Sequence, residues 1–257
     1  MANPLARQFD AVIPWEKRLA REVPLLEEIA RKAGRRILLP ACGTGGHVVA
    51  LAELGFEVLG LDIDEDALAL ARRKIAAARS PIAARGGHAE VQLLNMADGG
   101  TLGSVYDSAF CLGNALPSMS APGQLLGALR GVAGALRPGA VFLTQNLNFD
   151  LRWREKTPFF PVLSGATEEE EVLLVKFADY DPEFINFHGM FLSRPKSGGP
   201  WQPQVRNSRW LPLFRDRLID LLSQAGFGEF VCWGDYSKTP FDTAKSSDLL
   251  VYAQKSS

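Results

Sequence analysis

The sequence lacks an excess of charge of either sign. Its 28 lysine and arginine residues almost balance its 29 aspartate and glutamate residues, which leaves a formal net charge of −1. Proteins that bind nucleic acid ordinarily carry clustered basic residues, and no basic run here exceeds a few positions. We therefore expect no nucleic-acid partner and a small molecule as the ligand.

Long apolar runs are also missing. No stretch approaches the roughly 18 uninterrupted apolar residues of a membrane span, and the N-terminal MANPLARQFD has no apolar core typical of an export signal. These two absences predict no membrane association and a cytoplasmic location.

Cysteine and histidine are scarce and scattered. The sequence holds three of each, namely Cys42, Cys111, Cys232, His47, His88 and His188. No CxxC pair occurs, and no two histidines stand at the spacing of metal ligands, so we expect no metal site and no disulfide framework. This usage suits a reducing compartment.

Alternating apolar strand and helix patterns fill most of the chain. Strands are predicted at residues 35–40, 56–64, 89–95, 105–113, 140–148, 227–234 and 247–255, and helices at 15–33, 45–55, 65–80, 122–139 and 212–226. We expect Pro24 to kink or divide the first helix, and the turn of Arg137, Pro138 and Gly139 to end the helix at 122–139. The last two strands should be neighbours at a sheet edge. This order predicts an α/β fold with a doubly wound, mostly parallel, seven-stranded sheet.

Residues 150–208 interrupt the alternation. They contain aromatic and β-branched segments separated by proline and glycine clusters such as RPKSGGPWQP, which is typical of antiparallel strands and loops. We therefore predict a main domain formed by residues 1–149 and 209–257, with an inserted β-rich substrate lobe at 150–208.

The stretch LLPACGTGGH at residues 38–47 places glycines where a strand turns into a helix. Such a turn presents backbone N–H groups and the positive end of a helix to a ligand. The dinucleotide pattern GxGxxG fails at Val48, and a P-loop would need Lys followed by Ser or Thr where His47 stands. A nicotinamide oxidoreductase is therefore a weak alternative.

Asp62 follows Gly43 by 19 residues, at the end of the next strand, where a carboxylate can accept hydrogen bonds from ribose hydroxyls. The purely structural alternative is a tight corner whose aspartate caps the following helix. A calcium loop in DIDED fails because Ala67 stands where glycine is needed and Arg73 where glutamate is needed.

The sequence resembles the class I S-adenosylmethionine-dependent methyltransferases over residues 5–254. The motifs that carry the resemblance are ACGTGG, GLDID, FCLGNALPSM, LRPGA and LPLFRDRLIDLLSQAGF. CLGNALPSM, together with QNLNFD and WGDYSKTPFD, is similar to the glycine/sarcosine N-methyltransferase branch. The resemblance implies a Rossmann-like fold, S-adenosyl-L-methionine as cofactor, and methyl transfer to a small molecule, most readily to an amine nitrogen.

The resemblance also implies a set of cofactor-binding residues. Gly43 and Gly45 would approach the donor, Asp62 would hold the ribose, Ile63 would face the adenine, and Arg18, with Arg21 as substitute, would pair with the methionine carboxylate. The full set is Arg18, Ala41, Cys42, Gly43, Gly45, Asp62, Ile63, Asn95, Met96, Cys111 and Leu112. Asn95 and Met96 stand where relatives have an aspartate and an apolar residue beside the adenine amino group.

The acceptor side is expected at the C-terminal edge of the sheet. Asn114, His188 and Arg209 are the catalytic candidates, His188 as a base and Arg209 because relatives carry an arginine before the last helix. The substrate candidates are Trp15, Asn114, Asn146, Asn148, Tyr180 and Arg209. Whether the chain forms homo-oligomers stays open.

Two positions depart from the family pattern. Leu39 stands where relatives have an acidic residue in the first strand, and Leu147 stands where glycine-methylating relatives have an arginine that grips the substrate carboxylate. Glycine is therefore not the expected acceptor. An O-methyltransferase and a non-catalytic S-adenosylmethionine-binding protein remain as alternatives.

Overall fold

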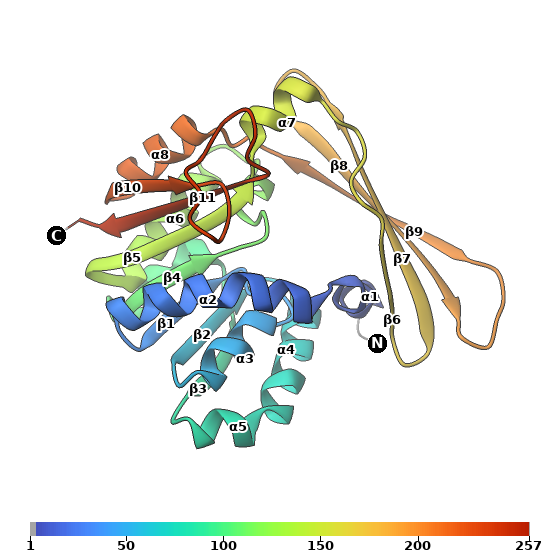
Figure 1. Cartoon of the computed structure of the whole chain (residues 1–257), viewed down its shortest axis with the longest axis horizontal. Coiled ribbons are helices and arrows are strands. Elements are labelled where there is room, and N and C mark those ends of the chain that lie inside the picture. Colours follow the sequence, from blue (N-terminus) through green and yellow to red (C-terminus); the bar gives the residue numbers. More distant parts are fainter. Residues whose placement is uncertain (1–3, 257) are drawn as a thin grey trace.

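The computed structural model describes residues 4–256, so the outermost residues of the predicted main domain, 1–3 and 257, lie outside it. Two sheets organise the chain (Figure 1). Sheet A contains β1 (Arg36–Pro40), β2 (Glu57–Asp62), β3 (His88–Leu93), β4 (Tyr106–Cys111), β5 (Leu136–Leu147), β10 (Phe227–Trp233) and β11 (Asp248–Lys255). Sheet B contains β6 (Leu163–Ala166), β7 (Glu170–Tyr180), β8 (Ile185–Pro195) and β9 (Gln202–Trp210).

The helices are α1 (Pro4–Val12), α2 (Trp15–Ala33), α3 (Gly46–Glu53), α4 (Glu65–Ala77), α5 (Arg79–Ala84), α6 (Gln124–Ala135), α7 (Phe149–Glu155) and α8 (Arg215–Gln224). Two short 3-10 helices follow β3 and β4, η1 (Met96–Leu102) and η2 (Leu116–Ser118). None of the helices within residues 4–256 combines the length and the apolar character that crossing a bilayer requires.

The predicted doubly wound sheet is confirmed. Sheet A has the strand order β10-β11-β5-β4-β1-β2-β3, and β3, β2, β1, β4 and β5 run parallel. β11 pairs antiparallel with both β5 and β10, which places β10 at the edge as expected. The chain order reverses between β1 and β4, and in such sheets ligands bind at the carboxyl ends of the strands beside this point.

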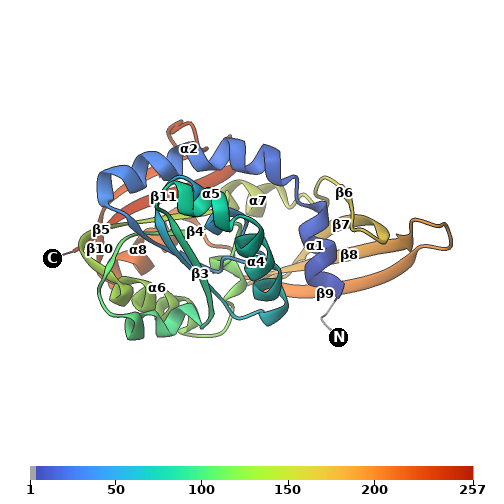
Figure 2. The ribbon, with the colours of Figure 1, turned by 90° about the horizontal axis from the view of Figure 1, so that it is seen from below.

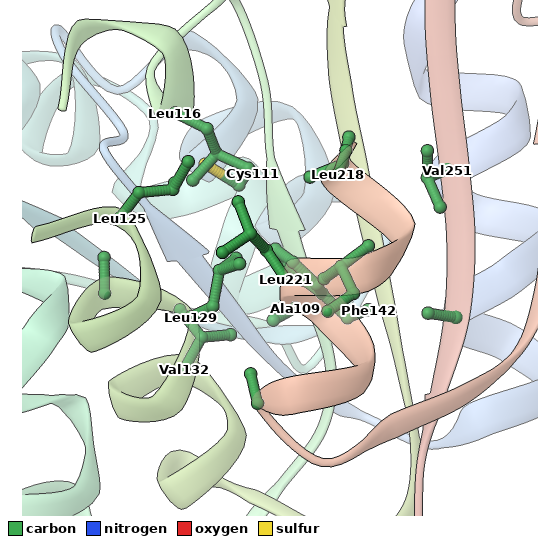
Figure 3. Packing of buried hydrophobic residues seen from close by; sticks show 14 of the residues in the cluster. Ala109, Cys111, Leu116, Leu125, Leu129, Val132, Phe142, Leu218, Leu221 and Val251 are labelled. Atoms are coloured by element: carbon green, nitrogen blue, oxygen red, sulfur yellow. The ribbon is translucent and has the colours of Figure 1, made fainter. Parts of the chain in front are cut away.

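Neighbouring residues of the central strands face opposite sides of sheet A. Ala109, Cys111 and Phe142 pack toward α6 and α8, where Figure 3 shows them against Leu129 and Leu221. The residues next to them in the sequence, such as Phe110 and Leu143, face the side covered by α2 and α3. Both faces of the sheet are therefore buried, which explains the continuous apolar runs of its strands.

Sheet B is antiparallel throughout and extends away from one end of sheet A (Figure 1). Figure 2 shows α1 beside the strands of sheet B, close to the start of α2. Leu5 and Val12 of α1 are buried with Val172, Leu174 and Phe191 of sheet B. The N-terminal helix therefore fastens sheet B to the rest of the molecule by apolar contact.

Local structure differs from the sequence prediction at several places. α2 continues through Pro24, since Leu25, Leu26 and Ile29 bury an apolar face that offsets the lost hydrogen bond. The helix predicted at 122–139 ends at Ala135, and the following Arg137, Pro138 and Gly139 belong to an irregular start of β5. α1 and α7 are short helices that the pattern did not predict.

Candidate active site

A cavity of about 500 Å³ lies between the carboxyl ends of β1, β2 and β4 and one face of sheet B. α1 and the start of α2 line its remaining side, through Phe9, Ile13 and Trp15. Of the residues predicted for the site, the cavity brings together Trp15, Arg18, Ala41, Cys42, Gly43, Asp62, Ile63, Leu112 and Asn114.

The glycines of the loop after β1 have different tasks. Gly43 has a φ of +55°, and a Cβ built on it would meet no atom within 4 Å, so this residue leaves open space in the cavity wall. Gly45 has a φ of +78° and precedes α3, and its Cβ would lie 2.6 Å from that of Ala71. Gly43 therefore borders the ligand space, whereas Gly45 does not line it and allows close packing of α3 on α4.

Asp62 holds this loop in place. Its Oδ2 accepts a hydrogen bond of 2.7 Å from the Gly43 N–H, and its Oδ1 accepts from the N–H groups of Ile63 at 2.8 Å and Asp64 at 3.0 Å. Because a carboxylate has about four acceptor positions, about one remains for a ligand hydroxyl. The capping residue of α4 is Asp64, so the capping role that we considered for Asp62 belongs to its neighbour.

A buried ionic cluster orients Arg18. Glu22 is 2% exposed and accepts hydrogen bonds from Arg18 at 3.1 Å, Arg21 at 2.6 Å and His47 at 2.8 Å. Burial opposes ionisation, but the hydrogen bond from His47 and the charge of Arg18 lower the pKa of Glu22 to about 2. Burial also lowers the pKa of His47, which keeps that ring neutral. Arg18 lies at the cavity wall with a fixed carboxylate behind it.

Asp10 joins three segments around the cavity. Its Oδ1 accepts hydrogen bonds from Trp15 Nε1 at 2.8 Å, from Lys74 Nζ at 2.5 Å and from the hydroxyl of Thr44. The ring of Trp15 in turn lies over Gly46, where a Cβ would approach it to 2.3 Å. No local sequence signal marks Asp10 and Thr44, because their partners are distant in the chain.

Asn114 lies just beyond β4 with a φ of +65°. Its Oδ1 accepts a hydrogen bond of 2.6 Å from the Leu147 N–H, which leaves the Nδ2 hydrogens for a ligand. The adjacent Gly113 N–H donates a hydrogen bond of 2.8 Å to Gln145 Oε1, and Gln145 Nε2 donates one of 2.7 Å to Asp248 Oδ1. Leu112 lines the cavity, whereas Cys111 is buried beneath it.

The cysteines near the site are not nucleophiles. Burial, together with the charge of Asp62, raises the pKa of the Cys42 thiol to about 12, and the same causes raise that of Cys111 to about 12. Both thiols stay protonated at neutral pH and act as small apolar groups.

Sheet B supplies the opposite wall. Leu174, Lys176, Phe187, Gly189, Phe191, Arg206 and Trp210 line the cavity from alternate positions of β7, β8 and β9, and we call this the inner face of sheet B. The rings of Phe187 and Trp210 stack with centroids 4.2 Å apart and planes 7° apart. Sequence reasoning missed Lys176, Arg206 and Trp210, although their alternation marks one face once the register is known.

His188 and Arg209 lie on the other, outer face of sheet B. His188 contacts Asn207 at 2.8 Å and Asp179 at 3.0 Å, and these contacts raise its pKa. Arg209 lies over the Phe184 ring at 4.7 Å. Since neighbouring residues of a strand point to opposite faces, Phe187, Gly189 and Trp210 reach the cavity in their place. The structure therefore does not bring His188 and Arg209 to the cavity lining.

Five other predicted residues lie away from the cavity lining. Asn148 caps α7 and donates to carbonyl groups of residues 242–246, Asn146 is fully buried in β5, and the Tyr180 hydroxyl donates to the Thr157 carbonyl. Asn95 is exposed and caps η1 through the Ala97 N–H, while Met96 is buried. The contacts of Asn148, Tyr180 and Asn95 within the fold account for these polar side chains without a ligand.

The lining of sheet A fits an adenosyl sulfonium compound. Gly43 opens space beside backbone N–H groups, Asp62 retains an acceptor position, and Ile63 offers an apolar side chain that is 72% exposed. Arg18 supplies a cation for a carboxylate at the same end of the cavity. Leu39 is buried in the lining, so the floor beneath the loop is apolar.

Comparisons with known proteins agree with this geometry. A family described as a methyltransferase domain matches residues 37–139. The glycine/sarcosine N-methyltransferase of Halorhodospira halochloris is 30% identical over 237 residues, which cover 90% of this chain and 80% of that protein.

Two solved structures share the fold. The CcbJ methyltransferase from Streptomyces caelestis has a TM-score of 0.70 and 24% identity, with 95% of this chain and 96% of that chain covered. The sugar N-methyltransferase KedS8 from a Streptoalloteichus species has a TM-score of 0.65 and 20% identity, with 91% and 85% covered.

Proposed function

The chain belongs to the class I S-adenosylmethionine-dependent methyltransferases, and on that premise we propose that it methylates the amine nitrogen of a small molecule. The observation that carries the proposal is one continuous cavity, which joins the loop around Gly43 and Asp62 to the aromatic wall of sheet B. Its two walls offer one place for a donor and one for an acceptor. S-adenosyl-L-methionine is the donor of this enzyme family.

We assign donor binding to the wall formed by sheet A. Asp62 and the backbone beside Gly43 would hold the ribose, Ile63 would cover the adenine, and Arg18 would pair with the amino-acid carboxylate. When bound, the donor supplies a methyl group that is already activated by a positively charged sulfur. The chain itself therefore needs to align the acceptor and exclude water.

The acceptor would lie between Asn114 and the inner face of sheet B. An amine attacks with its own lone pair, forms the N–C bond as the C–S bond breaks, and then loses a proton to water. Asn114 can orient the acceptor through its Nδ2 hydrogens, because Leu147 already occupies its oxygen. The faces of Phe187 and Trp210 favour the positive charge that develops on nitrogen.

Nitrogen is favoured over oxygen by the names of two similar proteins. The Halorhodospira relative and KedS8 are named as N-methyltransferases. Leu147 packs among apolar residues, where glycine-methylating relatives carry an arginine, so we propose an acceptor larger than glycine. We also propose that residues 150–208 form the substrate lobe, although β9 extends to Trp210.

The test combines calorimetry with product analysis. S-adenosylhomocysteine should bind the purified chain, and methyl-labelled donor should yield labelled N-methyl product with benzylamine but none with benzyl alcohol or benzoate. Labelled ether or ester would establish the O-methyltransferase alternative. Tight binding without transfer to any amine, alcohol or acid would establish a non-catalytic binding protein.

A further inference from the structure

Two cations and a glycine form one row across the inner face of sheet B. Lys176 of β7 pairs with Gly189 of β8, and Gly189 pairs with Arg206 of β9. All three line the cavity. Residues in register share a face, and strand spacing places the Cα atoms of Lys176 and Arg206 about 10 Å apart. Because Gly189 has no side chain, a gap lies between the two long cationic side chains, and we call it the bay. Its sides are Leu174 and Phe191, whose side chains lie 3.6 and 3.8 Å from a Cβ built on Gly189.

Neither cation has an anionic partner among residues 4–256. By contrast, Arg194 of sheet B pairs with Glu171 at 2.6 Å, and Lys74 beside the donor wall pairs with Asp10 at 2.5 Å. The Lys176 ammonium instead lies 5.8 Å from the centroid of the Phe160 ring. The wall therefore presents two cations without an ion-pair partner to the cavity, the half-buried Lys176 and the exposed Arg206, and both can donate hydrogen bonds to an anion.

The surroundings of Lys176 add to the unbalanced charge. Arg152 lies over the same Phe160 ring at 4.0 Å. Burial, together with the charge of Arg152, lowers the pKa of Lys176. An anion bound beside Lys176 would offset both the burial and the charge of Arg152. The charged form of Lys176 and the bound anion would therefore stabilise each other.

The other lining residues of this wall are apolar. The stacked rings of Phe187 and Trp210 lie beside the bay, and Phe191 and Leu174 continue the apolar surface toward α1. Stacked rings of this kind accept a planar or aromatic group by offset or edge contact. The acceptor therefore has room for a ring between its nitrogen and a terminal anion.

Building on the proposed N-methylation, we propose that the substrate is an amine that contains an aromatic ring and, remote from its nitrogen, a carboxylate, and that Lys176 and Arg206 bind this carboxylate. The arginine offers a planar fork of N–H donors, and the lysine offers a compact charge from the opposite side of the bay. Leu147 packs against the apolar core and cannot make such a contact, so Lys176 and Arg206 would supply it.

The test compares para-(aminomethyl)benzoate with para-(aminomethyl)benzamide, which differ only in the terminal charge. Calorimetry in the presence of S-adenosylhomocysteine should show the acid binding about tenfold or more tightly than the amide. The double variant Lys176→Met/Arg206→Met should bind both compounds equally and keep its affinity for S-adenosylhomocysteine. Arg217→Met, which removes an exposed cation of α8, should keep the preference for the acid.

Three results would overturn the carboxylate site: equal binding of acid and amide to the unmodified chain, no binding of the acid, or a preference that survives in the double variant. Methyl transfer to the same two compounds is measured separately. A preference for the acid without any transfer to nitrogen would refute the N-methyltransferase proposal and leave the carboxylate site intact. Methyl transfer to both compounds at equal efficiency and with equal affinity would refute the carboxylate site and leave the N-methyltransferase proposal intact.

Discussion

The two walls of the cavity are built in different ways. On the sheet A wall, backbone N–H groups, a left-handed Gly43 and the fixed carboxylate of Asp62 form the surface. On the sheet B wall, side chains at alternate strand positions form it, with Phe187 and Trp210 stacked beside two cations. Backbone groups and a fixed carboxylate suit the polar part of a ligand that never changes, whereas a wall whose contacts all come from side chains changes by single substitutions. The difference predicts that variants in the sheet A wall change the affinity for the donor, whereas variants in the sheet B wall change the affinity for the acceptor.

The largest expected effect is that of Asp62→Ala on donor binding. The substitution removes the acceptor of three backbone N–H groups and of a ribose hydroxyl, so affinity for S-adenosylhomocysteine should fall about a hundredfold or more. Calorimetry measures the change. Asp181→Ala is the matched control, since Asp181 also accepts backbone N–H groups, from Glu183 and Phe184 in a turn of sheet B. Equal losses in both variants would mean that the sheet A wall is not the donor site.

Glu22→Gln tests the support behind the donor wall. Because the pKa of Glu22 falls from 4.5 to about 2 on folding, its ionised form stabilises the fold by about 3 kcal/mol at neutral pH. Its folded pKa lies below the unfolded one, so this stability is present above pH 4.5 and is lost as the pH falls toward 2. His47 also destabilises the fold on acidification, because its folded pKa is lowered. This loss of stability begins as the pH falls below 6.5, the ordinary pKa of histidine.

Urea unfolding at several pH values provides the measurement. The unmodified chain should lose stability steadily on acidification, and Glu22→Gln should be less stable at pH 7 with a flatter profile below pH 4.5. Glu28→Gln is the control variant. Hydrogen bonds from Lys238 and Lys32 also lower the pKa of Glu28, but Glu28 lies at the surface, so removing its charge should flatten the profile less than Glu22→Gln does. A profile for Glu22→Gln as steep as that of the unmodified chain would exclude the cluster as the acid-sensitive element.

Trp210→Leu tests the acceptor wall. It keeps an apolar side chain but removes the ring that stacks on Phe187, so KM for an aromatic amine should rise several-fold to about tenfold. Affinity for S-adenosylhomocysteine should stay within about twofold. A parallel loss of donor affinity would show that the two walls do not act independently.

His188→Ala has the smallest expected effect. His188 is directed to the outer face of sheet B, where it contacts Asn207 and Asp179, so kcat/KM should change by less than about twofold. The pH dependence of kcat should also stay the same. A drop of a hundredfold would restore the catalytic role that the sequence first indicated and would place the acceptor on the other face of the sheet.

Much of the donor wall could be predicted from the sequence because its contacts are local or follow from strand order. Gly43 and Asp62 end neighbouring parallel strands, and parallel pairing brings those ends together whatever the side chains are. Even there, Gly45 was assigned to the ligand although it packs on Ala71. A glycine pattern does not distinguish space for a ligand from space for a helix.

The acceptor wall could not be predicted to the same extent. The sequence shows that Lys176 and Ala178 share one face of a strand and Phe177 the other, but it does not show which face meets the cavity. His188 and Arg209 were chosen for their chemistry, and a shift by one residue in each strand would have brought them inside. Asp10 was missed because its partner Lys74 is 64 residues away.

By itself, the sequence determined the seven-stranded α/β fold, the glycine loop and the position of Asp62, because hydrophobic periodicity and the order of parallel strands act over short distances in the chain. Only the tertiary structure decided which face of sheet B turns inward, and with it the row of Lys176, Gly189 and Arg206. The physical reason is that a strand has two equivalent faces, and the burial of Leu174 and Phe191 against α1 selects one of them.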